Sequence, residues 1–261
     1  MKKKISIAAI PDLGGGPWRY ERCKPWFPPN VNFKVVNIPG FGGQPSDDHF
    51  NSAEVFADHI RAQVQNMKKP LFLFGTGVGG SLVLQLIQDS QSRPFGTILH
   101  APMGPKVEPQ FYPEWMKRSW GRKILLNAMS MNMFQEHLRK KLFRQPIPDA
   151  FARQFFEEYR NCEAYDQIFR IINPQWFYEL EPVSKPSVIL WGGNETKPTQ
   201  DRIDAFKAVL PDAKVKFVKE WDYFPMIEQP RSFALELTSI TQEMLASDKQ
   251  KESKAKSSPS S

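Results

Sequence analysis

The stretch that decides the fold is Leu71–Ile87, which reads LFLFGTGVGGSLVLQLI. It opens with four apolar residues and closes with a second apolar segment from Ser81 to Ile87. Four glycines stand between them, at positions 75, 77, 79 and 80. Glycine tolerates the backbone angles of tight turns and lets chains approach closely. The stretch therefore predicts a strand, a tight glycine turn and a helix.

Short apolar segments of the same kind recur along the chain. They are residues 5–10, 33–38, 96–100, 187–191 and 214–218. Helical patterns separate most of them, at residues 52–67, 81–89, 199–209 and 231–245, the first with Ser52 as its N-cap. Strands that alternate with helices predict an α/β fold with a mostly parallel sheet flanked by helices.

The alternation is interrupted once. Residues 102–182 are rich in Met, Phe, Trp and Tyr and predict several helices inserted between two strands, as in a helical lid. We therefore expect a core made of residues 1–101 and 183–246. Residues 247–261 are rich in Lys and Ser and predict a disordered basic tail.

Composition narrows the cellular setting. Cys23 and Cys162 have no metal-ligand spacing and predict no disulfide framework, which favours a reducing cytoplasm. No apolar run approaches the ~18 residues of a membrane-spanning helix. The apolar run 5–10 is shorter than that of a signal peptide. We expect no cofactor and, because no nucleic-acid motif accompanies the charge of +7, no nucleic-acid partner.

Much of the positive charge lies in the expected lid. The clusters are Lys117–Arg118, Arg122–Lys123 and Arg139–Arg144. A solvated helix face explains such clusters. An anionic partner, a membrane surface or an acyl-carrier protein explains them as well, so these alternatives stay open.

Four further segments stand in a recognisable order around the glycine turn. They are Pro11–Gly15 (PDLGG), Asn37–Ser46 (NIPGFGGQPS), Leu190–Glu195 (LWGGNE) and Asp222–Pro230 (DYFPMIEQP). With these segments the chain resembles the α/β-hydrolase superfamily over residues 4–245, particularly its small lidded esterases and C–C bond hydrolases. The resemblance implies the α/β-hydrolase fold.

The catalytic positions of that superfamily carry other residues here. The serine of its G-x-S-x-G turn, which attacks the substrate, corresponds to Gly77, which has no side chain to form a covalent intermediate. The triad acid corresponds to Glu195 and the triad histidine to Tyr223. A tyrosine with a pKa near ~10 is protonated at neutral pH and cannot serve as the base. The resemblance therefore predicts a degenerate triad and a pseudoenzyme.

The resemblance also implies an anion hole, made by the backbone N–H groups of Leu13 and Val78 at the start of a helix. We expect it to bind a carbonyl, carboxylate or phosphate of a small apolar or acidic ligand; a protein partner is the other expectation. The expected ligand-binding residues are Leu13, Val78, Thr76, His100, Trp115 and Tyr223.

Two alternatives remain open. A noncovalent lyase, cyclase or isomerase would use His100, Asp12 or Tyr223 as acid or base. A dinucleotide-binding protein would use Gly75, Gly77 and Gly80 of a G-x-G-x-x-G turn, although no acidic residue ends the next strand. The expected lid aromatics line a cavity or fill a core: Phe111, Tyr112, Trp115, Trp120, Phe155, Phe156, Tyr159 and Phe169.

Overall fold

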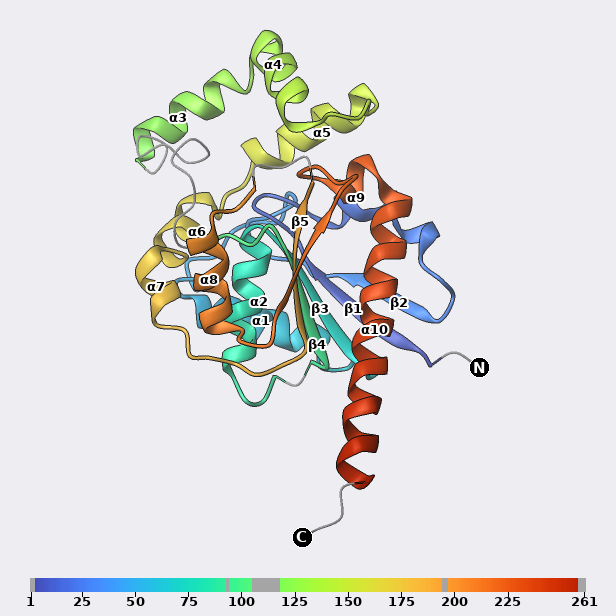
Figure 1. Cartoon of the computed structure of the whole chain (residues 1–261). Helices are drawn as coiled ribbons and strands as arrows, with labels where there is room; N and C mark the ends of the chain where they lie inside the picture. Colours follow the sequence, from blue (N-terminus) through green and yellow to red (C-terminus); the bar gives the residue numbers. More distant parts are fainter. Residues whose placement is uncertain (1–2, 93, 105–117, 194–196, 258–261) are drawn as a thin grey trace.

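The computed structural model describes residues 3–92, 94–104, 118–193 and 197–257. Its centre is a six-stranded, wholly parallel sheet in the order β2-β1-β3-β4-β5-β6 (Figure 1). The strands are β1 Ile5–Ile10, β2 Val31–Val35, β3 Leu71–Thr76, β4 Gly96–His100, β5 Ser187–Gly192 and β6 Lys214–Val218. The predicted parallel sheet is thus confirmed. Only the second strand is displaced by more than a residue or two from its predicted bounds.

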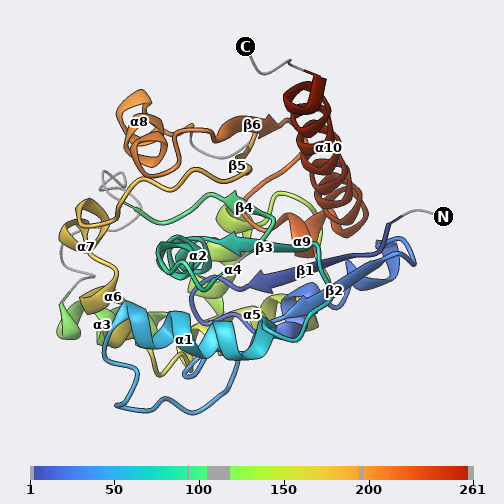
Figure 2. The same cartoon turned by 90° about the horizontal axis from the view of Figure 1, so that it is seen from below.

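Helices cover both faces of the sheet (Figure 2). Those of the core are α1 Ala53–Val64, α2 Val78–Gln88, α8 Gln200–Val209, α9 Pro225–Glu228 and α10 Pro230–Ser257, with short 3-10 turns at Pro17–Tyr20 and Lys24–Trp26. The predicted N-cap is present, because the Val55 N–H donates to Ser52 Oγ at 3.4 Å. α10 continues through residues 247–257, where the composition predicted a disordered tail.

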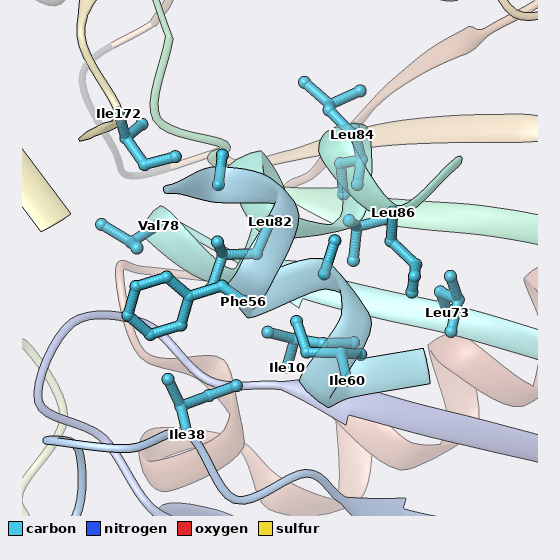
Figure 3. Packing of buried hydrophobic residues seen from close by; sticks show 14 of the residues in the cluster. Ile10, Ile38, Phe56, Ile60, Leu73, Val78, Leu82, Leu84, Leu86 and Ile172 are labelled. Carbon is cyan, nitrogen blue, oxygen red and sulfur yellow. The ribbon is translucent and has the colours of Figure 1, made fainter. Parts of the chain in front are cut away.

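Alternate residues of each central strand pack into two separate hydrophobic cores, one on each face of the sheet. In β3, Leu71 and Leu73 join the cluster under α1, α2 and α8, whereas Phe72 and Phe74 join the cluster under α10. This is the period of two expected of a strand buried on both faces. Figure 3 shows the first cluster, in which Phe56 and Ile60 of α1 pack near Ile10 and Leu73 of the sheet.

Helices α3–α7 lie between β4 and β5, where the sequence predicted an insertion. They are α3 Ser119–Ala128, α4 Asn132–Leu142, α5 Asp149–Arg160, α6 Tyr165–Ile171 and α7 Pro174–Tyr178, and we call them the helical insert. In Figure 1, α3, α4 and α5 lie above the carboxyl ends of the central strands. None of the helices in the described ranges is long and apolar enough to cross a membrane.

The glycine turn brings α2 very close to the sheet. A Cβ at Gly79 would lie 2.2 Å from the Ile10 carbonyl oxygen, and one at Gly75 would lie 2.5 Å from the Gly79 carbonyl oxygen. Both distances are shorter than any side chain permits, so α2 can pack here only with glycine at these positions.

Candidate functional site

The candidate site lies at the carboxyl ends of β1, β3 and β4, which are neighbours in the sheet. Asp12 follows β1, Gly77 follows β3 and His100 ends β4. Because the carboxyl ends of parallel strands share one edge of the sheet, ligands of such folds bind there. The sheet therefore brings together three residues that the sequence separates by up to 88 positions.

Gly77 forms the sharp turn between β3 and α2. Its φ of 52° and ψ of −120° suit glycine and strain other residues. Its N–H donates to the His100 carbonyl at 3.1 Å, and its own carbonyl accepts from the Met103 N–H at 2.9 Å. The turn is thus held by the last residue of β4 and by the chain that follows it.

The Asp12 carboxylate occupies the space beside this turn. Its Oδ1 accepts a hydrogen bond from the Val78 N–H at 2.9 Å. A Cβ built on Gly77 would lie 2.0 Å from the same Oδ1 and 2.4 Å from Cγ. Asp12, in its present position, therefore excludes any side chain at position 77.

Asp12 also engages the predicted anion hole. Burial raises the pKa of its carboxyl above the ordinary value, and backbone hydrogen bonds from Val78 and Leu13, with the charges of Arg19 and His100, oppose that rise. Val78 and Leu13 are the two residues that the resemblance assigned to the hole. The chain thus supplies its own carboxylate to donors that were expected to face a ligand.

A buried ion pair holds the loop that carries Asp12. Arg19 Nε lies 3.2 Å from Glu158 Oε2 of α5, with the two side chains 3% and 11% exposed. Arg19 Nη2 also donates to the Leu13 carbonyl at 3.4 Å. The Arg19 guanidinium stacks on the Phe155 ring at 4.5 Å. Sequence reasoning missed this pair, because nothing local relates two residues 139 positions apart.

His100 is enclosed rather than open to a ligand. It has no exposed surface. Its Nδ1 lies 3.1 Å from Thr76 Oγ1, a hydrogen bond between neighbouring strands. Its ring meets the Trp221 ring edge to face at 5.5 Å. These contacts bury His100 and Thr76 between the neighbouring strands and the Trp221 ring.

The remaining predicted site residues are spread over several segments. Tyr223 is partly buried in the loop between β6 and α9. Glu195 lies outside the described residues, as do Trp115, Phe111 and Tyr112. Of the other insert aromatics, Phe155 and Phe156 are buried in the core beneath α10 and the insert, Tyr159 and Phe169 are partly buried, and Trp120 is half exposed.

A second set of contacts, also missed, joins the insert to the Tyr223 segment. Arg144 Nε lies 3.3 Å from Oδ1 of the buried Asp222. Glu228 Oε1 accepts from the N–H groups of Arg144 and Gln145 at 2.9 and 3.0 Å. Burial, together with the Asp222 charge, raises the pKa of Glu228 to about 7. The segment that aligns with the triad histidine is thus fastened to the insert.

Metal ligands do not gather in the described ranges, where no group of three or more His, Cys, Asp or Glu side chains could hold an ion. The described site presents the part-buried Asp12 carboxyl group and the backbone N–H donors around it.

Solved structures with the same architecture are numerous. The chain superposes on Lip1 from Acinetobacter baumannii AYE with a TM-score of 0.73 and 19% identity, covering 94% of this chain and 85% of that one. For MenH from S. aureus the TM-score is 0.69 at 15% identity, and the match covers 94% of this chain and 96% of MenH. For the RedJ thioesterase of the prodiginine pathway of Streptomyces coelicolor the TM-score is 0.61 and the sequence identity 13%. That match covers 91% of this chain and 86% of the thioesterase.

At these identities the structural matches show the fold alone. A search of curated proteins gives no match. The profile of the alpha/beta hydrolase family, however, matches residues 14–236, which is most of the chain. The glycine turn, the parallel sheet and the profile agree, and the chain belongs to the alpha/beta hydrolase family.

Proposed function

We propose that this chain is a non-hydrolytic member of its family, which acts by binding and not by acyl transfer. The observation that carries the proposal is the position of the Asp12 carboxylate. It accepts from the Val78 N–H at 2.9 Å and fills the space that a side chain at position 77 would need. A nucleophile side chain and the Asp12 carboxylate exclude one another there.

Two requirements of covalent hydrolysis are unmet in this arrangement. Gly77 offers no nucleophilic atom. The backbone donors that would stabilise an oxyanion already hold a carboxylate, which would also repel the negative charge that develops there. Loss of a single oxyanion donor typically lowers kcat by about 10²–10³. The site as folded therefore opposes the transition state that the family's hydrolases stabilise.

The same carboxylate changes the ligand we expect. An acidic group would have to displace Asp12 or lie beside it, and like charges in a part-buried site disfavour each other. We therefore propose that a small ligand presents a neutral or cationic polar group to Asp12 beside an apolar body. A protein partner held by the insert is the second form that the binding function can take.

The dinucleotide alternative gains no support from the glycines. Gly75 and Gly79 are needed where α2 touches β1 and β3, and a Cβ at Gly80 would lie 2.8 Å from the Pro102 side chain. These contacts account for the glycines without a bound phosphate.

One observation favours a second candidate function, noncovalent acid–base catalysis. Burial raises the pKa of the Asp12 carboxyl. A carboxyl group with a raised pKa at the end of a strand is typical of a general acid or base. In this alternative Asp12 is the residue that donates or accepts the proton. The carbonyl of the enclosed His100 accepts the Gly77 N–H of the glycine turn.

Labelling and turnover together test the proposal. We expect the wild-type chain to show no stoichiometric adduct with a fluorophosphonate in its intact mass and no turnover of p-nitrophenyl esters. Native mass spectrometry of the same sample would then look for a ligand that leaves on denaturation. Stoichiometric labelling, or ester turnover that co-purifies with the chain, would overturn the non-hydrolytic assignment.

Asp12→Asn separates the two candidates, because asparagine keeps the shape and loses the titrating proton. A reaction found by substrate screening and abolished in Asp12→Asn would establish the acid–base alternative. A ligand that binds the wild type and is weakened in Asp12→Asn, with no reaction in either protein, would support binding at Asp12.

A further inference from the structure

Exposed large apolar side chains concentrate at one place in the described structure, the outer part of the helical insert. Trp120 and Ile124 of α3 are 50% and 54% exposed. Met131 and Met133, at the turn into α4, are 55% and 80% exposed. Exposed apolar side chains that gather on neighbouring helices mark an interaction site more often than scattered single residues do.

The two helices are amphipathic, and their inner faces are already used. Leu125 of α3 and Met129, which caps the end of that helix, are buried in the core that the insert shares with α10. Trp120 and Ile124 are four residues apart and so lie on one face of the helix, away from Leu125 and Met129. In α4, Phe134, Leu138 and Leu142 pack against the same core. Ile124, Met131 and Met133 are exposed and are not among the residues that pack in this core.

Positive charge surrounds this apolar surface. Residues 118–145 contain seven Lys and Arg residues and a single acidic one, Glu136. Arg139 pairs with Glu136 and Asp149, and Arg144 pairs with Asp222. The exposed cations that flank the apolar residues are Arg118 and Lys123 on the α3 side and Lys140 and Lys141 on the α4 side.

We propose that this surface, residues 118–141, which we call the insert tip, binds the surface of an anionic lipid bilayer. Trp, Ile and Met side chains would enter the boundary between headgroups and acyl chains, and the flanking lysines and arginines would contact anionic headgroups. Amphipathic helices with a basic polar face and exposed Trp or aliphatic residues bind membranes in this way.

The shape of the insert tip favours a bilayer over a protein partner. α3 and α4 form the outermost layer of the molecule above the sheet, at the opposite end from the C-terminus of α10 (Figure 1). The most exposed apolar residue, Met133, stands at the start of α4 and is 80% exposed. Protruding side chains suit a deformable surface, whereas protein anchors usually occupy matching pockets. This inference does not depend on the proposed function.

Vesicle flotation with the full chain tests the inference. One set of vesicles contains phosphatidylcholine alone and the other contains equal parts phosphatidylcholine and phosphatidylserine. We expect binding to the second set only, weakening as salt is raised because headgroup attraction is screened. Lys140→Glu/Lys141→Glu should weaken that binding by about tenfold or more. Ile124→Ser/Met133→Ser should weaken it by a similar factor.

Matched control variants distinguish binding by the insert tip from binding caused by overall net charge or by exposed apolar residues elsewhere. Lys68→Glu/Lys69→Glu makes the same charge change at exposed residues before β3, at the other end of the sheet. Tyr178→Ser/Leu235→Ser removes two exposed apolar side chains elsewhere, which are 65% and 48% exposed. Both controls should bind like the wild type, and all four variants should keep its thermal unfolding midpoint.

Failure of the wild-type chain to bind the anionic vesicles would overturn the inference and leave the insert tip to a protein partner. Equal losses in the insert-tip and control variants would also overturn it, because they would assign binding to net charge alone.

Discussion

At the residue scale, the pairing of Asp12 with Gly77 distinguishes this site. The glycine turn and its place after the third strand were predictable from the sequence, because glycine spacing is a local signal. That the Asp12 carboxylate fills the turn was not predictable. The two residues are 65 positions apart, and only the pairing of β1 with β3 brings them together.

Gly77→Ser should destabilise the protein. Serine would take a φ of 52° and place its Cβ 2.0 Å from Asp12 Oδ1. Backbone strain of this kind costs about 1–3 kcal/mol, and the clash adds to it. Urea unfolding should therefore show a loss of about 3 kcal/mol in the free energy of unfolding.

The double variant Asp12→Gly/Gly77→Ser serves as the control, because it removes the clash and leaves the strain. It should recover at least about 1 kcal/mol relative to the sum of the two single changes. Strictly additive losses would show that the two positions do not compete for space.

At the element scale, the strands and the helices α1, α2, α8 and α10 were predictable, because each segment carries a period-two or a helical pattern of apolar residues. The short helix α9 was not predicted. The bounds of β2 and the length of α10 were not predictable. β2 is an edge strand with exposed residues, so its apolar signal is weak. The last turns of α10 carry a polar composition that is compatible with either a helix or a tail.

Gly79→Ala should disrupt the docking of α2 on β1. The added methyl would lie 2.2 Å from the Ile10 carbonyl oxygen, which is backbone and cannot move aside. We expect a loss of about 3 kcal/mol or more in thermal or urea unfolding.

Gly43→Ala is the matched comparison. Gly43 has a φ of 77° but open space around its Cβ direction, so only the conformational cost of about 1–2 kcal/mol applies. Equal losses in the two variants would contradict the close packing of α2.

At the scale of the whole molecule, charged groups fasten the insert to the core in the described residues. Arg19 pairs with Glu158, Arg144 pairs with Asp222, and the Arg144 N–H donates to Glu228. These contacts were not predictable, because long-range ion pairs leave no local pattern. The contact with Glu228 has a pH dependence. Glu228 ordinarily titrates at 4.5 and has its pKa raised to about 7 in the folded state.

A raised carboxyl pKa means that the folded state binds this proton more tightly than the unfolded state. The stabilisation that protonated Glu228 gives the folded state is fully present below its unfolded pKa of 4.5. That stabilisation is lost as the pH rises through about 7. Glu228→Gln removes this titration and keeps an acceptor for the Arg144 and Gln145 N–H groups. Between about pH 5 and about pH 8 the wild type should therefore lose about 1 kcal/mol relative to Glu228→Gln, a value reduced for solvent screening.

Glu220→Gln, at an exposed position before the same loop, should leave the pH dependence of the wild type unchanged. A constant difference between wild type and Glu228→Gln across the pH range would contradict the assignment.

The proposed function depends on the Asp12 carboxylate occupying the anion hole that the family resemblance implies at Leu13 and Val78. The most direct measurement is the pH titration of the Val78 backbone amide by nitrogen–proton NMR, with Asp12→Asn as the control. We expect the Val78 resonance to follow a single titration with a midpoint above the ordinary aspartate pKa of 3.8, and Asp12→Asn to abolish that titration. A Val78 amide resonance that does not change as Asp12 ionises would contradict this placement of the carboxylate, and the proposed loss of hydrolysis would then rest on Gly77 alone.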